Sequence, residues 1–146
     1  MTTSRKKMVV GNWKMNGLRS SLKEITSING SVKKVECEIV VCPPTTLLSE
    51  ALRVANGSQV KIGCQNCHAN ESGAHTGEIS AQMLYDLGIE IVILGHSERR
   101  LNNFETSSVI RQKAATAHIH NLTTIICVGE SDAQKMRGQT LKVVTD

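Results

Sequence analysis

Aromatic side chains are nearly absent from this 146-residue chain, which has one Trp, one Tyr and one Phe. Proteins that bind single-stranded nucleic acid usually stack bases on aromatic rings and gather basic residues on one face. The net charge here is only +4, part of it from Arg5, Lys6 and Lys7. The sequence therefore argues against a nucleic-acid partner and favours a small anionic ligand.

Long apolar runs are also missing, since no stretch approaches the roughly 20 residues of a membrane-spanning helix. The basic N-terminus is followed by Gly11, Asn12 and Lys14 instead of an apolar signal core. We therefore expect a cytoplasmic protein without membrane contact. In that compartment cysteines are usually reduced thiols rather than disulfides; the chain has Cys37, Cys42, Cys64, Cys67 and Cys127.

Glycine motifs for nucleotide binding are absent, because neither G-x-x-x-x-G-K nor G-x-G-x-x-G occurs. The stretch Cys64-Gln65-Asn66-Cys67-His68 matches the haem-attachment pattern C-x-x-C-H. It follows a predicted strand, however, and no second cysteine pair with zinc-ligand spacing exists. We interpret Cys64 and Cys67 as thiols packed at a strand end, and we expect no metal and no cofactor.

The chain alternates between short aliphatic runs and segments with helical spacing. Uninterrupted aliphatic runs are typical of strands covered on both faces, as in parallel sheets. They occupy residues 7–10, 38–42, 60–63, 89–94 and 123–128. Helices are expected over 18–28 with a stop at Asn29-Gly30, 48–55, 79–87, 109–117 and, more weakly, from Ser131 to Val143. Pro43-Pro44 begins a loop, after which Thr45 or Thr46 is the expected helix cap.

This alternation predicts one α/β domain, residues 1–146, with about five parallel strands joined by helical crossovers. The pattern alone leaves two architectures open, a doubly wound sheet or part of a β/α barrel. In both, chemistry is placed at the carboxyl ends of the strands.

Two predicted strand ends carry such chemistry. Gly11-Asn12-Trp13-Lys14 follows the first strand, where residues two apart on a strand would point to the same side. Lys14 offers a positive charge for a phosphate or an oxyanion, and Asn12 offers neutral hydrogen bonds. A surface lysine beside a turn-forming asparagine is the alternative.

The second strand end is Gly95-His96-Ser97-Glu98-Arg99-Arg100, directly after the aliphatic run 89–94. A short helix beginning there would direct its positive end at His96 and disfavour protonation of the imidazole. A neutral imidazole can donate a hydrogen bond to a carbonyl oxygen and exchange a proton. A capping or core histidine is the alternative, and Glu98 and Arg99 beside it favour a functional one.

Five stretches together make the chain resemble triosephosphate isomerase over nearly its full length. They are 11–16 (GNWKMN), 65–66 (QN), 72–80 (SGAHTGEIS), 95–100 (GHSERR) and 127–130 (CVGE). The resemblance implies a β/α barrel, specifically an incomplete one with the first five of eight strands. It also implies the interconversion of dihydroxyacetone phosphate and glyceraldehyde 3-phosphate through an enediol, in glycolysis and gluconeogenesis, without a cofactor.

The resemblance also assigns roles to single residues. Asn12 and Lys14 would bind the phosphorylated triose, Lys14 would stabilise the enediolate, and His96 would be the neutral electrophile that polarises the carbonyl. Glu98 would support them in the same pocket. In the homodimer of the family, Thr76 would enter the partner's site, and Glu78 would pair with Arg99 across the interface.

One departure from the family is large, because β/α barrels run to about 250 residues and this chain has 146. No residue here matches the glutamate that removes the substrate proton, and Glu130 occupies a different position. We therefore expect a truncated chain with negligible isomerase activity alone. The alternative is a non-catalytic interaction fragment that pairs with a separate C-terminal half.

Overall fold

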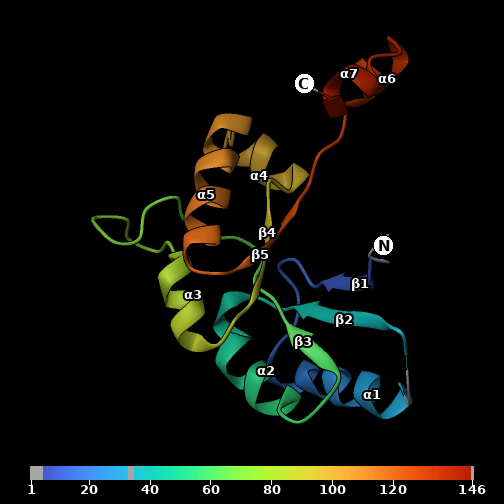
Figure 1. Ribbon diagram of the computed structural model, residues 1–146, viewed down its shortest axis with the longest axis vertical. Helices are drawn as coiled ribbons and strands as arrows, with labels where there is room; N and C mark the ends of the chain where they lie inside the picture. The colour runs from blue at the N-terminus through green and yellow to red at the C-terminus, as the bar shows by residue number, and fades with distance from the viewer. Residues whose placement is uncertain (1–4, 33–34, 146) are drawn as a thin grey trace.

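The computed structural model describes residues 5–32 and 35–145. Strands and helices alternate along the chain as predicted (Figure 1). Their order is β1 (Lys7–Asn12), η1 (Arg19–Leu22), α1 (Lys23–Ser31), β2 (Cys37–Cys42), η2 (Thr45–Leu47), α2 (Leu48–Ala55), β3 (Val60–Ile62), α3 (Ala81–Leu87), β4 (Ile91–Leu94), α4 (Ser97–Asn102), α5 (Ser107–Ile119), β5 (Thr123–Ile126), α6 (Asp132–Met136) and α7 (Thr140–Thr145), where η marks a 3₁₀ helix.

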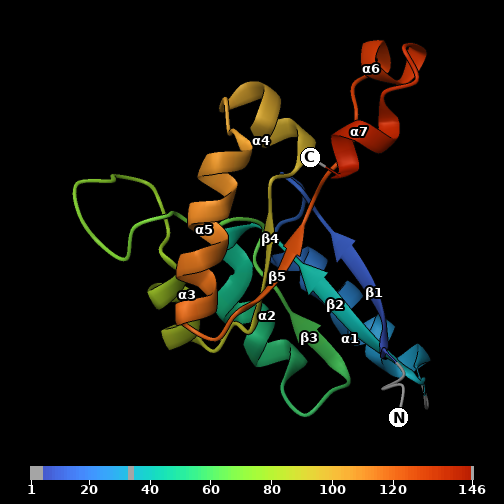
Figure 2. The ribbon, with the colours of Figure 1, turned by 45° about the horizontal axis from the view of Figure 1, so that its top comes forward.

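All strand pairs are parallel and follow the chain order, as β1-β2-β3 and β4-β5. Cys64 joins the two groups by a parallel bridge to Val92. Its N–H donates to the Ile91 carbonyl at 2.8 Å, and its carbonyl accepts from the Ile93 N–H at 2.8 Å. Among the described residues β1 pairs only with β2 and β5 only with β4, so the sheet forms a partial barrel that does not close (Figure 2).

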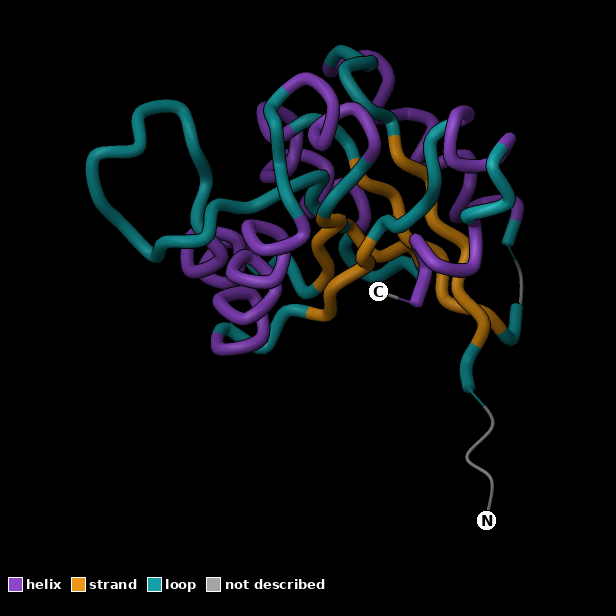
Figure 3. Tube along the Cα trace, turned by 90° about the horizontal axis from the view of Figure 1, so that it is seen from above, coloured by secondary structure: helices purple, strands orange, loops and turns teal. Residues whose placement is uncertain are grey.

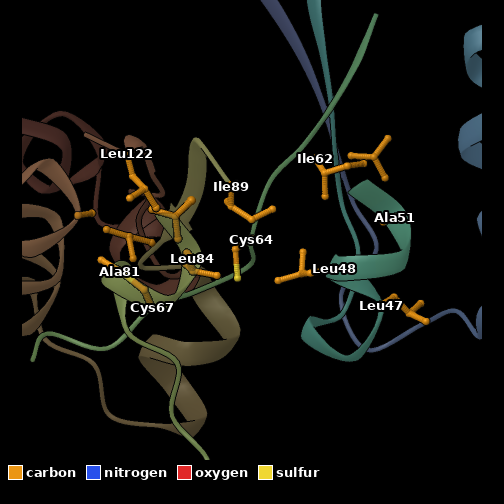
Figure 4. Close-up of a cluster of buried hydrophobic side chains, with 14 of the residues drawn as sticks. Leu47, Leu48, Ala51, Ile62, Cys64, Cys67, Ala81, Leu84, Ile89 and Leu122 are labelled. Carbon is orange, nitrogen blue, oxygen red and sulfur yellow. The ribbon is translucent and has the colours of Figure 1, made fainter. Parts of the chain in front are cut away.

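Both faces of the central strands are buried, which is why their sequences read as continuous apolar runs. On β4, Val92 and Leu94 pack into the main core between sheet and helices. Ile91 and Ile93 point the other way and pack with Val40 and Cys42 in a second, smaller cluster. In the main core Cys64 lies between Leu48 of α2 and Leu84 of α3 (Figure 4).

The helix boundaries correct two of the predictions. Helix α1 continues through Asn29 and Gly30 to Ser31, so the predicted stop is wrong. Neither Thr45 nor Thr46 caps a helix; Pro44 is the N-cap of η2 and no side chain caps it. The predicted end of α3 at Gly88 is confirmed, since this residue adopts φ +93°, which glycine alone adopts at no steric cost.

Two segments extend from the rest of the structure. The loop 69–79 extends from the helical side, as both Figure 1 and Figure 3 show. Beyond β5, the single helix predicted from Ser131 is in fact two, because Gly138 at φ +66° lies between α6 and α7. These two helices lie apart from the other elements (Figures 1 and 2).

Candidate active site

Lys14 lies beyond the first strand, and this corrects the geometric argument from the sequence. Strand β1 ends at Asn12, so the alternation of side chains along a strand does not reach Lys14. Lys14 instead adopts φ +54°, a left-handed conformation that costs a non-glycine residue about 1–2 kcal/mol. The Asn12 Oδ1 accepts a hydrogen bond from the Lys14 N–H at 2.9 Å, so the Asn12 side chain stabilises this turn.

The two predicted strand ends nevertheless meet. The Lys14 Nζ lies 2.5 Å from Glu98 Oε1, although the two residues are 84 positions apart. The other carboxylate oxygen of Glu98, Oε2, contacts His96 Nδ1. Glu98 therefore links the ammonium from the end of β1 to the imidazole from the end of β4.

His96 is held by the turn that begins α4. It is the N-cap of that helix, and its carbonyl accepts hydrogen bonds from the Arg99 and Arg100 amides at 2.9 and 3.1 Å. Burial, and secondly the positive charge of Lys14, hold the pKa of His96 below its usual value. The imidazole is therefore neutral at pH 7.

These groups line an open cavity of about 730 Å³ at the carboxyl ends of the strands. Polar side chains from several segments of the chain surround it. The lining residues are Asn12, Lys14, Met15, Asn16, Thr45, Gln65, Asn66, Gly77, Glu78, Ile79, His96, Glu98, Arg99, Asn102 and Asn103. The cavity combines an ammonium, a neutral imidazole and several amides, which is a set suited to a small oxygen-rich anion.

The wall of this cavity is supported by a buried ion pair that the sequence analysis missed. Lys113 of α5 donates to Glu105 Oε1 at 2.7 Å and to Asn66 Oδ1 at 2.9 Å. The Arg99 Nε donates to the same Glu105 oxygen at 2.5 Å. One signal for Lys113 was present, since it lies on the apolar face of its helix, three residues after Ile110 and four before Ala117.

The Glu105 network predicts a loss of stability in acid. Burial raises the pKa of Glu105, but the hydrogen bonds and charges of Lys113 and Arg99 outweigh it and bring the pKa below the usual 4.5. The folded state then binds fewer protons than the unfolded state, so stability is lost as pH falls below about 4.5. Urea unfolding between about pH 5 and 3 should show this fall, and Glu105→Gln should make it shallower. An equally steep fall in that variant would contradict the assignment to Glu105.

The two cysteines of the C-x-x-C-H stretch lie in the core, as predicted for packed thiols. Cys64 and Cys67 are each 1% exposed, and the Cys64 Sγ lies 3.2 Å from the Asn66 carbonyl, to which it donates. Burial raises the pKa of Cys64, and that of Cys67 to about 11. Within the described residues no three His, Cys, Asp or Glu side chains gather as a metal site would require.

This burial predicts the order in which the thiols react. In the native chain, a disulfide reagent at pH 8 should modify the half-buried Cys37 and Cys127 first. Cys42, Cys64 and Cys67 should react only at the rate of unfolding, because their thiolates are both disfavoured and inaccessible. Thiol counts in buffer and in urea check this, and fast reaction of all five thiols in buffer would contradict it.

The residues assigned to a dimer interface occupy two places. Thr76 is exposed on the loop 69–79. Glu78 and Arg99 both line the cavity, and Arg99 Nε is held by Glu105 of the same chain. The pairing of Glu78 with Arg99 across an interface stays a prediction, since it involves a second chain.

Comparison with known proteins decides the family. The family model described as triosephosphate isomerase matches residues 7–146. The chain belongs to the triosephosphate isomerase family. It is 50% identical over 140 residues to the triosephosphate isomerase of Ruegeria pomeroyi, covering 96% of this chain and 56% of that protein. It is 46% identical over 148 residues to that of Xanthobacter autotrophicus, covering 99% and 58%.

Solved structures agree with the family. The crystal structure of the triosephosphate isomerase from Bartonella henselae superimposes with a TM-score of 0.92 at 39% identity, covering 97% of this chain and 59% of that chain. The chain thus spans a little under three-fifths of the length of these triosephosphate isomerases. Along residues 5–32 and 35–145, no helix combines the length and hydrophobicity of a membrane span.

Proposed function

We propose that this chain supplies the lysine and histidine part of a triosephosphate isomerase active site. The protein that contains it would interconvert dihydroxyacetone phosphate and D-glyceraldehyde 3-phosphate through an enediol, in glycolysis and gluconeogenesis. The observation that carries the proposal is the convergence of Lys14 and His96 on Glu98 in one polar cavity.

Lys14 and His96 would act on different oxygens of the substrate. The Lys14 ammonium is a point charge, so it attracts the substrate phosphate and the negative oxygen of the enediolate. At His96, Nδ1 contacts Glu98 and lies 3.4 Å from Ser97 Oγ, so Nε2 is the nitrogen that would face a substrate oxygen. A neutral imidazole carries one proton, so Nε2 would donate to that oxygen in the tautomer in which Nδ1 accepts from the Ser97 hydroxyl and Glu98 has turned away. A neutral histidine electrophile is a known feature of triosephosphate isomerases, and the family membership supports the proposal of this role for His96.

These 146 residues alone should turn over substrate at a negligible rate. None of their carboxylates matches the family's proton-abstracting glutamate, and a general base typically contributes about 10²–10⁴-fold. Glu98 is already paired with Lys14 and His96, so it is not free for that role.

A chimera tests the proposal. Residues 1–146 would be joined to the part of the Ruegeria pomeroyi enzyme that follows its matched region, and glyceraldehyde 3-phosphate formation would be followed by a coupled assay. We expect turnover from the chimera and none above background from residues 1–146 alone. A folded chimera without turnover would overturn the proposal.

The exposed strands at the ends of the sheet favour a second candidate, a non-catalytic fragment that pairs with another polypeptide. Val9 of β1 is 60% exposed and Ile126 of β5 is 51% exposed. Unpaired strand edges bind further strands readily. Mixing the chain with the remaining part of the Ruegeria pomeroyi enzyme as a separate polypeptide tests this, since a stable complex by size exclusion supports pairing.

The partner and the location also belong to the proposal. The exposure of Thr76 on the loop 69–79 supports a homodimer in which this loop contacts a second copy. Absence of a nucleic-acid partner and a cytoplasmic location stay predictions from the sequence.

A further inference from the structure

The unusual backbone at Lys14 needs contacts that hold it, because its left-handed conformation is unfavourable for lysine. Two of these contacts are local. Lys14 N–H donates to Asn12 Oδ1 at 2.9 Å, and Asn16 Nδ2 donates to the Trp13 carbonyl at 3.0 Å. A third ties the segment to the sheet, where the Trp13 N–H donates to the Cys42 carbonyl at 3.0 Å.

Gln65 supplies a further contact to the Lys14 backbone, and it comes from 51 residues away. Its Nε2 donates to the Lys14 carbonyl at 2.9 Å and to the Cys42 carbonyl at 2.8 Å. Both acceptors are carbonyls, which only accept, so the chemistry fixes the nitrogen of the amide on this side. A single side-chain amide thus bridges the turn after β1 to the end of β2.

The backbone of Gln65 is itself well placed for this task. It follows Cys64, the residue that joins the three-stranded and two-stranded parts of the sheet. The Gln65 side chain therefore reaches the turn of Lys14 from the position where the sheet meets β4, the strand that leads to His96. Gln65 thus links the segment of Lys14 to the part of the sheet that leads to His96, and its side-chain hydrogen bonds go to the Lys14 and Cys42 carbonyls.

We propose that Gln65 is a positioning residue that holds Lys14 in its left-handed turn, so that the ammonium meets Glu98 and His96. Without the Gln65 donor, the Lys14 carbonyl loses its hydrogen bond from the far side of the turn, and the backbone relaxes to an ordinary negative φ. The ammonium then leaves the cavity, while the remainder of the fold keeps its core contacts.

This inference deepens the proposed function, and its test does not depend on isomerase activity. In the 146-residue chain, Gln65→Met keeps the length of the side chain and removes the donor. NMR chemical shifts of the Lys14 Cα report the backbone conformation, and the imidazole resonances of His96 report its titration. Glu98 contacts His96 and the charge of Lys14 acts on it, while Glu78 and Arg99 line the same cavity.

We expect two changes in Gln65→Met. The Lys14 Cα shift should move toward that of an ordinary extended or helical lysine, and the pKa of His96 should rise as it does in Lys14→Gln, because the ammonium has left. Gln82→Met, at an exposed glutamine of α3, should change neither. A merely structural role for Gln65 would lower stability without moving the His96 titration in the direction of Lys14→Gln.

An unchanged Lys14 Cα shift in folded Gln65→Met would overturn the inference. If that variant does not fold, Gln65→Asn keeps an amide but is one methylene too short to reach both carbonyls, and the same two readouts apply. A fully active chimera carrying Gln65→Met would also count against the inference, whereas an inactive chimera with native Gln65 would count only against the isomerase.

Discussion

Lys14→Met in the chimera with the Ruegeria pomeroyi segment lowers kcat/KM by about 10²–10³-fold, the loss typical of removing one preorganised group that stabilises an oxyanion. The ammonium is the only cation within 2.5 Å of Glu98 among the described residues, and it lies in the cavity beside His96. Met fills nearly the same space without the charge. Steady-state kinetics over a range of substrate concentrations measures the effect on kcat and KM.

The loss should come from chemistry and binding and not from unfolding. The side chains of Lys14 and Glu98 are 54% and 46% exposed, and ion pairs that exposed contribute about 0–1 kcal/mol to stability. Urea unfolding of the Lys14→Met chimera should therefore be close to that of its parent. Lys23→Met, at an exposed lysine of α1, should leave both activity and stability unchanged. Parental kcat/KM in Lys14→Met would remove Lys14 from the site.

Lys113→Met is expected to destabilise the 146-residue chain by about 3 kcal/mol, at the lower end of the cost of breaking a buried ion pair. The side chains of Lys113 and Glu105 are each 5% exposed, so the Glu105 carboxylate would stay buried without its lysine partner. Arg99 still holds one oxygen, which moderates the loss. Glu105 Oε2 already has no hydrogen-bond partner among the described residues. The midpoint of urea unfolding measures the change.

Two further variants separate the ion pair from general damage to α5. Arg111→Met, at an exposed position of the same helix, should change stability by less than about 0.5 kcal/mol. The double variant Glu105→Leu/Lys113→Met should lose less than Lys113→Met alone, because it leaves neither charge of the pair buried without the other. If the loss of stability in the double variant equals the sum of the losses in Glu105→Leu and in Lys113→Met, the pair does not interact.

Much of the fold was predictable because its central strands are buried on both sides. The runs that became β2 and β4 are apolar without alternation, and each face packs into its own cluster. Helix ends were predictable where a glycine adopts positive φ, as Gly88 does, and not where Asn29 and Gly30 continue a helix. Gly30 is not among the glycines of positive φ, so the residue type alone did not mark a helix end there.

The sequence predicted which residues belong to the candidate site better than it predicted how they are arranged. The positions of Lys14, His96 and Glu98 after strands placed them at one end of a parallel sheet, and they meet there. The left-handed turn at Lys14 was not predictable, since its contacts include the Gln65 amide, which also bonds to the Cys42 carbonyl and comes from a distant part of the chain. Glu105 and Lys113 were missed because a paired buried charge resembles a surface charge in sequence.

The bridge at Cys64 has a consequence for the cavity. Lys14 follows the three-stranded part of the sheet and His96 follows the two-stranded part, and Cys64 joins the two parts. One core cluster spans both parts, with Leu48 and Leu84 on either side of Cys64 (Figure 4). The relative placement of Lys14 and His96 is therefore fixed by side chains far from the cavity as well as by the two backbone hydrogen bonds of Cys64.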